Sequence, residues 1–143
     1  MGDRHKGESL TEFVRAGGPL RGAALHRLAL GSAAAMARMH AHGVTGLRLT
    51  PDNVALGTRG QVLVGVQQGS PGRGGPAADV RDWAELVTFA SGSGALPQPL
   101  RGVVERCRRP EPVGRPSAAH VVRVLLGHTM ATAVASVDDL LRK

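Results

Sequence analysis

Two histidines, His40 and His42, stand two residues apart near the end of a helical pattern and are the clearest candidates for chemistry in this sequence. Imidazole is a common ligand of zinc and other transition metals, so such a pair could contribute to a metal site. A complete site needs further ligands, and no companion cluster of cysteine, histidine or aspartate is visible. We therefore favour a packed or solvated helix end over a metal site for both histidines.

Other sequence signatures of catalysis or nucleotide binding are missing. There is no P-loop and no serine in a G-x-S-x-G context, and the glycine-rich stretch 69–75 is not framed by a strand and a helix. Cys107 is the only cysteine, which excludes an intramolecular disulfide and a cysteine-based zinc site. A chain without disulfides fits a reducing compartment, so we expect a cytoplasmic protein.

Charge and composition limit the kinds of partner. The 143 residues carry a formal net charge of +7 and have a sequence pI of about 11.4, which would suit nucleic acid or another anionic partner. However, the excess is scattered arginine in a chain rich in Ala, Gly and Pro, which a GC-rich coding bias explains equally well. The chain has only three aromatic residues, too few for a base-stacking platform, so we consider nucleic acid an unlikely partner. No segment reaches the roughly 18 apolar residues of a membrane span.

The apolar spacing predicts a mainly α-helical domain. The expected helices are 8–15, 21–42, 79–90, 99–108 and 117–127. The two longest carry the most apolar faces and should form the centre of the core. Ser9 and Ser117 have the side chains of N-caps for the first and last of these helices.

Two short apolar strands, 53–56 and 61–66, are joined by a segment with two glycines, which predicts a small β-hairpin. The Gly- and Pro-rich stretch 69–76 should hold no regular structure. Residues 1–7 are expected to be disordered, and residues 128–143 to form an amphipathic C-terminal helix. The apolar residues of that helix are Met130, Val134, Val137, Leu140 and Leu141.

In the order and the residues of their sequence blocks, residues 8–127 resemble the C-terminal lobe of bacterial eukaryotic-like Ser/Thr protein kinases. "LHRLALGSAAAMARMHAHGV" is similar to the long helix before the catalytic loop, and "TGLRLTPDNVAL" stands where the family has H-R-D-L-K-P-E-N and a strand. "ADVRDWAELVTFASG" resembles the family's central buried helix, and "LRGVVERCRRPEPVGRPSAAHVVRVLL" its final helices. The resemblance implies a protein-kinase-like C-lobe that lacks the N-lobe, because the sequence begins at about the kinase hinge.

Most positions that carry the family's chemistry hold other residues. Arg48 stands at the position of the catalytic Asp, which accepts the proton of the substrate hydroxyl, and an arginine cannot accept a proton. The preceding His and Arg are replaced by Gly46 and Leu47, and the phosphate-contacting Lys by Thr50. Asn53 matches a family metal ligand, but we favour a turn-forming role for it, since Asn readily binds its local backbone.

After the catalytic loop, the position of the family's metal-binding residue has changed, whereas positions with a structural role are kept. The metal-binding D-F-G would begin at Val66, and valine offers Mg²⁺ no ligand. In the family, Asp79 would hydrogen-bond the catalytic-loop backbone, and Arg115 would pair with a Glu of an A-P-E motif that this sequence lacks. We expect structural roles for both, a core position for Trp83, and an inert packed thiol at Cys107.

These observations predict a catalytically inactive kinase homologue, a pseudokinase, that serves as a protein-interaction or regulatory module. The face that would meet an N-lobe and the amphipathic tail 128–143 are the expected contact surfaces for an unidentified protein or a second copy. We expect no cofactor and no metal ion. Two alternatives stay open: a split Ser/Thr kinase chain completed by a partner's N-lobe, and a basic helical nucleic-acid-binding protein.

Overall fold

The computed structural model describes residues 8–57, 62–64, 75–92 and 94–127. Several predictions lie outside these residues and stay predictions. They concern the N-terminal segment 1–7, most of the hairpin turn, Val66, and the tail 128–143 with Met130, Val134, Val137, Leu140 and Leu141. Within the described residues, no helix is long and apolar enough to cross a membrane.

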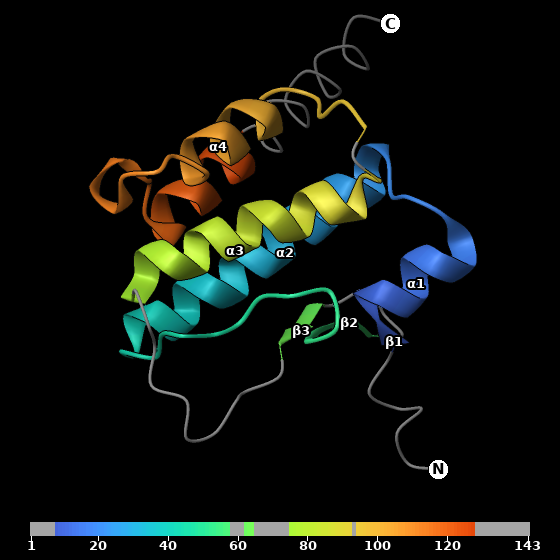
Figure 1. Ribbon diagram of the computed structural model, residues 1–143, viewed down its shortest axis with the longest axis horizontal. Coiled ribbons are helices and arrows are strands. Elements are labelled where there is room, and N and C mark those ends of the chain that lie inside the picture. The colour runs from blue at the N-terminus through green and yellow to red at the C-terminus, as the bar shows by residue number, and fades with distance from the viewer. Residues whose placement is uncertain (1–7, 58–61, 65–74, 93, 128–143) are drawn as a thin grey trace, which may run out of the picture.

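Two long antiparallel helices, α2 (Gly22–Ala41) and α3 (Gly75–Ala90), form the centre of the molecule (Figure 1). On one side of this pair lie α4 (Leu100–Cys107), the short 3₁₀ helix η2 (Pro112–Gly114) and a last helix over residues 118–127. On the other side lie a small sheet and α1 (Leu10–Gly17). This arrangement agrees with the mainly α-helical class that the sequence predicts.

The predicted N-caps are confirmed by hydrogen bonds at both helices. Ser9 Oγ accepts a bond of 3.2 Å from the backbone N–H of Glu12, and Ser117 Oγ accepts one of 3.1 Å from that of His120. The start of α3 was predicted wrongly, because the helix begins at Gly75 and not at Asp79. A proline fits the first turn of a helix, where its missing N–H has no partner to lose, so Pro76 starts this helix within a stretch expected to be irregular.

The sheet has three antiparallel strands in the order β1 (Glu8–Ser9), β2 (Val54–Leu56) and β3 (Val62–Val64). The pairing of β2 with β3 was predicted, but β1 was missed because two residues are too short to show alternation. Ser9, Ala55 and Leu63 are cross-strand partners and share one face of the sheet, and the other face packs on α2. Gly31 permits this packing, since a Cβ there would lie 2.8 Å from Val62 Cγ2.

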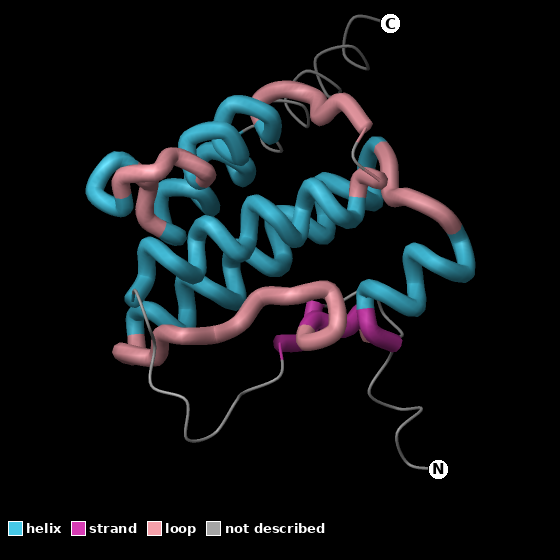
Figure 2. The backbone as a smooth tube through the Cα atoms, viewed as in Figure 1, coloured by secondary structure: helices cyan, strands magenta, loops and turns pink. Residues whose placement is uncertain are grey.

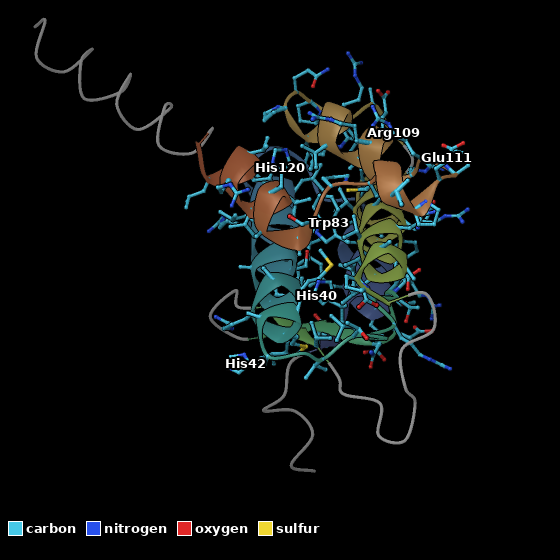
Figure 3. The ribbon with its side chains drawn as sticks, turned by 90° about the vertical axis from the view of Figure 1, so that its left-hand side faces the viewer. His40, His42, Trp83, Arg109, Glu111 and His120 are labelled. Carbon is cyan, nitrogen blue, oxygen red and sulfur yellow. The ribbon has the colours of Figure 1, made fainter. Side chains whose placement is uncertain are left out.

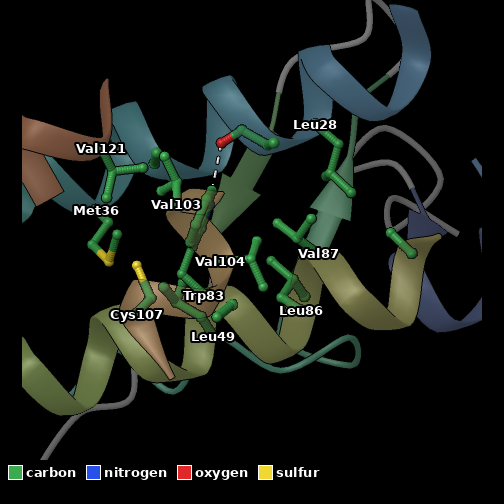
Figure 4. Close-up of a cluster of buried hydrophobic side chains, with 14 of the residues drawn as sticks. Leu28, Met36, Leu49, Trp83, Leu86, Val87, Val103, Val104, Cys107 and Val121 are labelled. Carbon is green, nitrogen blue, oxygen red and sulfur yellow. Dashed lines mark hydrogen bonds between the residues drawn. The ribbon is translucent and has the colours of Figure 1, made fainter. Parts of the chain in front are cut away.

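The core lies between the helices and centres on Trp83, which is fully buried and reaches from α3 to α2 (Figure 4). The indole Nε1 donates to the carbonyl of Ala29 at 3.2 Å and to Ser32 Oγ at 3.0 Å. The buried hydroxyl of Ser32 donates in turn to the carbonyl of Leu28 at 2.7 Å. Cys107 is also buried, and burial raises the pKa of its thiol to about 12. The only tryptophan of the chain is therefore a part of the core.

Candidate functional site

The candidate site is the loop over residues 42–53, which runs along one side of α2 and α3 and leads into β2 (Figure 2). Two of its residues have left-handed backbone conformations, Gly46 with φ 69° and Arg48 with φ 55°. Arg48 is the only non-glycine residue with a positive φ in the described part of the chain. A left-handed conformation costs a residue with a Cβ about 1–2 kcal/mol, so the loop must be held in place by other contacts.

Asp79 supplies the central contact. This residue lies in the first half of α3 and is 1% exposed. Its Oδ1 accepts a hydrogen bond of 2.9 Å from the backbone N–H of Leu47, and its Oδ2 accepts one of 3.1 Å from that of Gly46. The left-handed turn points two successive backbone N–H groups in the same direction, and the carboxylate of Asp79 accepts hydrogen bonds from both. The loop and α3 are joined by a buried charge whose hydrogen bonds are satisfied.

His40 completes this arrangement; the sequence favoured a packed or solvated helix end for it and did not predict its contact with Asp79. Its Nε2 lies 2.9 Å from Asp79 Oδ2, and its side chain is 12% exposed. Residues 32, 36 and 40 follow one another at intervals of four on α2, so His40 continues the buried stripe of Ser32 and Met36. That spacing was the available signal. His40 therefore contacts a carboxylate and belongs to the support of the loop, whereas His42 is exposed and lies 2.9 Å from the carbonyl of Arg38.

Asn53 holds the loop from the other end. Its Nδ2 donates to the carbonyls of Leu47 and Arg48, at 3.1 Å and 3.0 Å. The backbone N–H groups of Asn53 and Val54 both donate to the carbonyl of Thr50, which closes the turn before β2. These contacts are those of a turn-forming asparagine. They also explain why β2 begins at Val54 and not at Asn53 as predicted.

A further pair of contacts joins the loop to α1. The hydroxyl of Thr11 donates to Asp52 Oδ1 at 2.6 Å, and the backbone N–H of Thr11 donates to the carbonyl of Pro51 at 3.2 Å. Three separate elements, α1, α2 and α3, therefore contribute to the support of one loop. The side chains of Arg48 and Thr50 are exposed and have no hydrogen bond to any described residue in this support.

Arg115 lies on another side of the molecule and is bound by backbone carbonyls. Its Nε donates to Arg109 at 2.8 Å, one terminal nitrogen donates to Ala77 at 3.0 Å, and the other to Pro110 at 3.2 Å. Residue Ala77 belongs to the first turn of α3, so this guanidinium connects the chain before the last helix to α3. Arg115, whose partner motif in the resemblance is missing from this sequence, thus has three carbonyl partners.

The acidic groups described near the loop are too few to hold a metal ion. Within the described residues, no group of three or more His, Cys, Asp or Glu side chains could hold a metal ion. Asp82 follows Asp79 by one helical turn, and burial together with repulsion from Asp79 raises its pKa, although Arg81 opposes this. The structure brings Gly46, Leu47, Asn53 and Asp79 together and leaves Trp83 and Arg115 apart from them.

No protein-family model matches the chain, and no curated protein matches it. Among solved structures, the crystal structure of Rad53 1–466 in complex with AMP-PNP is similar, with a TM-score of 0.69 and 17% sequence identity. The match covers 82% of this chain and 43% of that one, so the chain spans less than half the length of this protein kinase. At such low identity the likeness shows the fold alone. The chain has a protein-kinase-like fold, in agreement with the resemblance in its sequence.

Proposed function

We propose that the chain is a catalytically inactive, kinase-like C-lobe, a pseudokinase, that acts by binding another protein. The observation that carries the proposal is the loop over residues 42–53. Its backbone is held by Asp79 and Asn53, and His40 contacts Asp79, yet Arg48 stands where the resemblance places the catalytic Asp. A loop that keeps its supporting hydrogen bonds but has lost its catalytic carboxylate is expected where the fold is under selection and catalysis is not.

The chemistry of phosphoryl transfer supports this reading. The reaction needs a group that orients the acceptor hydroxyl and metal ions that neutralise the phosphates. An arginine side chain has no acceptor for a proton, so Arg48 cannot serve as the base. Both hydrogens of the Asn53 amide are donated to loop carbonyls, and a single carbonyl oxygen cannot provide the octahedral oxygen ligands that Mg²⁺ requires.

The outer face of the sheet supports a role in binding. Ala55 and Leu63 are cross-strand partners on the face that does not pack on α2, and Leu63 is among the exposed large apolar residues of the described chain. We assign to this side of the sheet, as a part of the proposal, the face that would meet an N-lobe. The same surface therefore suits the alternative in which another chain supplies that lobe.

The test is transfer of the terminal phosphate of labelled ATP, with Mg²⁺, to the chain itself and to a general protein substrate. We compare the wild-type chain with Arg48→Asp, which restores a carboxylate at the catalytic position. We expect no transfer from either protein, because Val66 also stands where the metal-binding Asp of the D-F-G is expected. Transfer by the wild type, or its appearance in Arg48→Asp, would show that the site is competent and the proposal wrong.

A thermal shift with ATP distinguishes the split-kinase alternative. A ligand that binds the native state must raise the melting temperature. We expect ATP, with or without Mg²⁺, to leave the melting temperature of the chain unchanged. A clear increase would favour a chain that senses nucleotide and is completed by a partner.

A further inference from the structure

The loop between α4 and the last helix, residues 109–117, presents an apolar side chain to solvent at the end of the molecule away from His42. Figure 3 shows Arg109 and Glu111 at that end. Val113, in η2, is 95% exposed, whereas the next most exposed large apolar residue described, Leu126, is 44% exposed. A single exposed valine is ordinary on a protein surface, so the surroundings of Val113 decide its meaning.

The first feature of these surroundings is rigidity. One guanidinium nitrogen of Arg109 donates to the carbonyl of Gly114 at 3.0 Å, and Arg115 binds the carbonyls of Arg109, Pro110 and Ala77. The N–H groups of Gly114 and Arg115 also donate to carbonyls within the turn. The loop contains three prolines, which fix their own φ angles. Val113 is therefore held in a defined position although nothing packs on its side chain.

The second feature is positive charge. Residues 100–117 contain five arginines and two glutamates. Among the described residues, Arg108 forms an ion pair with Glu85 and His40 lies beside Asp79, so neither Arg109 nor Arg115 is neutralised by a described carboxylate. Their hydrogen bonds go to neutral carbonyls, which orient the guanidinium groups and leave their charge in place.

We propose that the loop over residues 109–115 is a docking site for an acidic peptide segment that carries an aliphatic side chain. This inference rests on the proposed function as an interaction module and names the class of partner. A residue whose backbone is already held in place loses little backbone entropy when a partner covers it, so Val113 is a favourable anchor. The positive charge that Arg109 and Arg115 retain in this loop favours acidic over basic partners.

Glu111 gives the proposal a directional consequence. It is exposed, lies two residues before Val113, and forms no ion pair with a described residue. Its negative charge opposes an acidic ligand at the same surface. Replacement by lysine should therefore tighten binding, whereas a loss of folding or of loop order would weaken it.

The probe is a display library of short random peptides, selected on the wild-type chain and then measured as labelled synthetic peptides by fluorescence anisotropy. We expect the enriched peptides to combine Asp or Glu with Leu, Ile or Val. Val113→Asp should weaken their binding by at least about tenfold, as expected for an anchor residue. Val44→Asp is the matched control, because Val44 is also an exposed valine but lies just beyond α2, and it should leave binding unchanged.

Glu111→Lys should tighten binding several-fold, and added salt should weaken it. Urea unfolding followed by Trp83 fluorescence checks that each variant folds. Failure to enrich acidic peptides, equal binding to Val113→Asp, or equal loss in Val44→Asp would overturn the docking site. Binding to anionic vesicles and to duplex DNA is measured in the same way. If these ligands bind as tightly as the peptides and Val113→Asp does not weaken them, the surface attracts negative charge without specificity and the docking site is wrong. None of these results depends on phosphoryl transfer, so failure here is distinguishable from failure of the proposed function.

Discussion

The support that Asp79 gives to the loop leads to a quantitative prediction for Asp79→Asn. The carboxylate accepts bonds from Gly46 and Leu47 and contacts His40, all at 2.9–3.1 Å, in a place that is 1% exposed. An asparagine keeps one acceptor oxygen and puts an NH₂ group in place of the other. At least one buried N–H then faces another donor.

The expected loss follows from these contacts. Hydrogen bonds to a charged group contribute about 1.5–3 kcal/mol each, and an unsatisfied buried donor costs about 1–3 kcal/mol. We therefore expect Asp79→Asn to lower the free energy of unfolding by about 2–4 kcal/mol, a large part of the roughly 5–15 kcal/mol typical of a domain. For a chain of this size the melting temperature should fall by about 4–16 °C.

The measurement is urea unfolding followed by the fluorescence of the single tryptophan, Trp83, which is fully buried in the native state. Asp82→Asn is the matched control, because Asp82 lies on the same helix one turn later and its ionised form is disfavoured by burial and by Asp79. It should be neutral or slightly stabilising. A loss below about 1 kcal/mol in Asp79→Asn, or equal losses in both variants, would refute the account of the loop.

The remaining predictions concern the titrating groups of the core and the close contact between α2 and the sheet. Burial raises the pKa of the Cys107 thiol from its ordinary value of 9.0 to about 12, so the thiol should resist alkylation in the native chain and react after unfolding. Its contribution to stability should fall as pH rises above 9.0, because only the unfolded chain then loses the proton, and Cys107→Ala should remove that slope in urea titrations at several pH values. Asp82 has a raised pKa, so its ionisation opposes folding at neutral pH; stability should rise as pH falls through the folded pKa towards 3.8, and Asp82→Asn should flatten this change. Gly31→Ala should destabilise the chain by about 1–3 kcal/mol, because its Cβ would meet Val62, whereas Gly17→Ala has open space and should be neutral or stabilising; a loss in Gly17→Ala as large would contradict the packing.

The sequence predicted the helices of the core well because apolar periodicity over ten or more residues is a strong signal. It predicted the Ser9 and Ser117 caps, since the capping chemistry is local. It missed β1, because a two-residue strand has no period, and it placed the start of α3 late because Gly75 and Pro76 were taken for a loop. These errors lie at element ends, where tertiary contacts decide.

The site was predicted in part. The family resemblance predicted that Asp79 hydrogen-bonds the backbone of the loop. The structure contains two such hydrogen bonds, from the backbone N–H groups of Gly46 and Leu47. The contact with His40 was missed because the histidine was considered with His42, its neighbour in sequence, although the buried stripe of α2 pointed to His40 alone. The carbonyl partners of Arg115 could not be predicted, since the path of the loop over residues 109–115 depends on contacts with α3.

The most direct test of the central claim is Asn53→Ala, measured for stability and for Mg²⁺-dependent ATP binding in the same preparation. If the loop is kept for its fold, the loss of two hydrogen bonds to Leu47 and Arg48 should lower the free energy of unfolding by about 1–3 kcal/mol. Neither the wild type nor the variant should then bind Mg²⁺-ATP. Unchanged stability, together with wild-type Mg²⁺-ATP binding that Asn53→Ala abolishes, would show that Asn53 is a metal ligand and contradict the account.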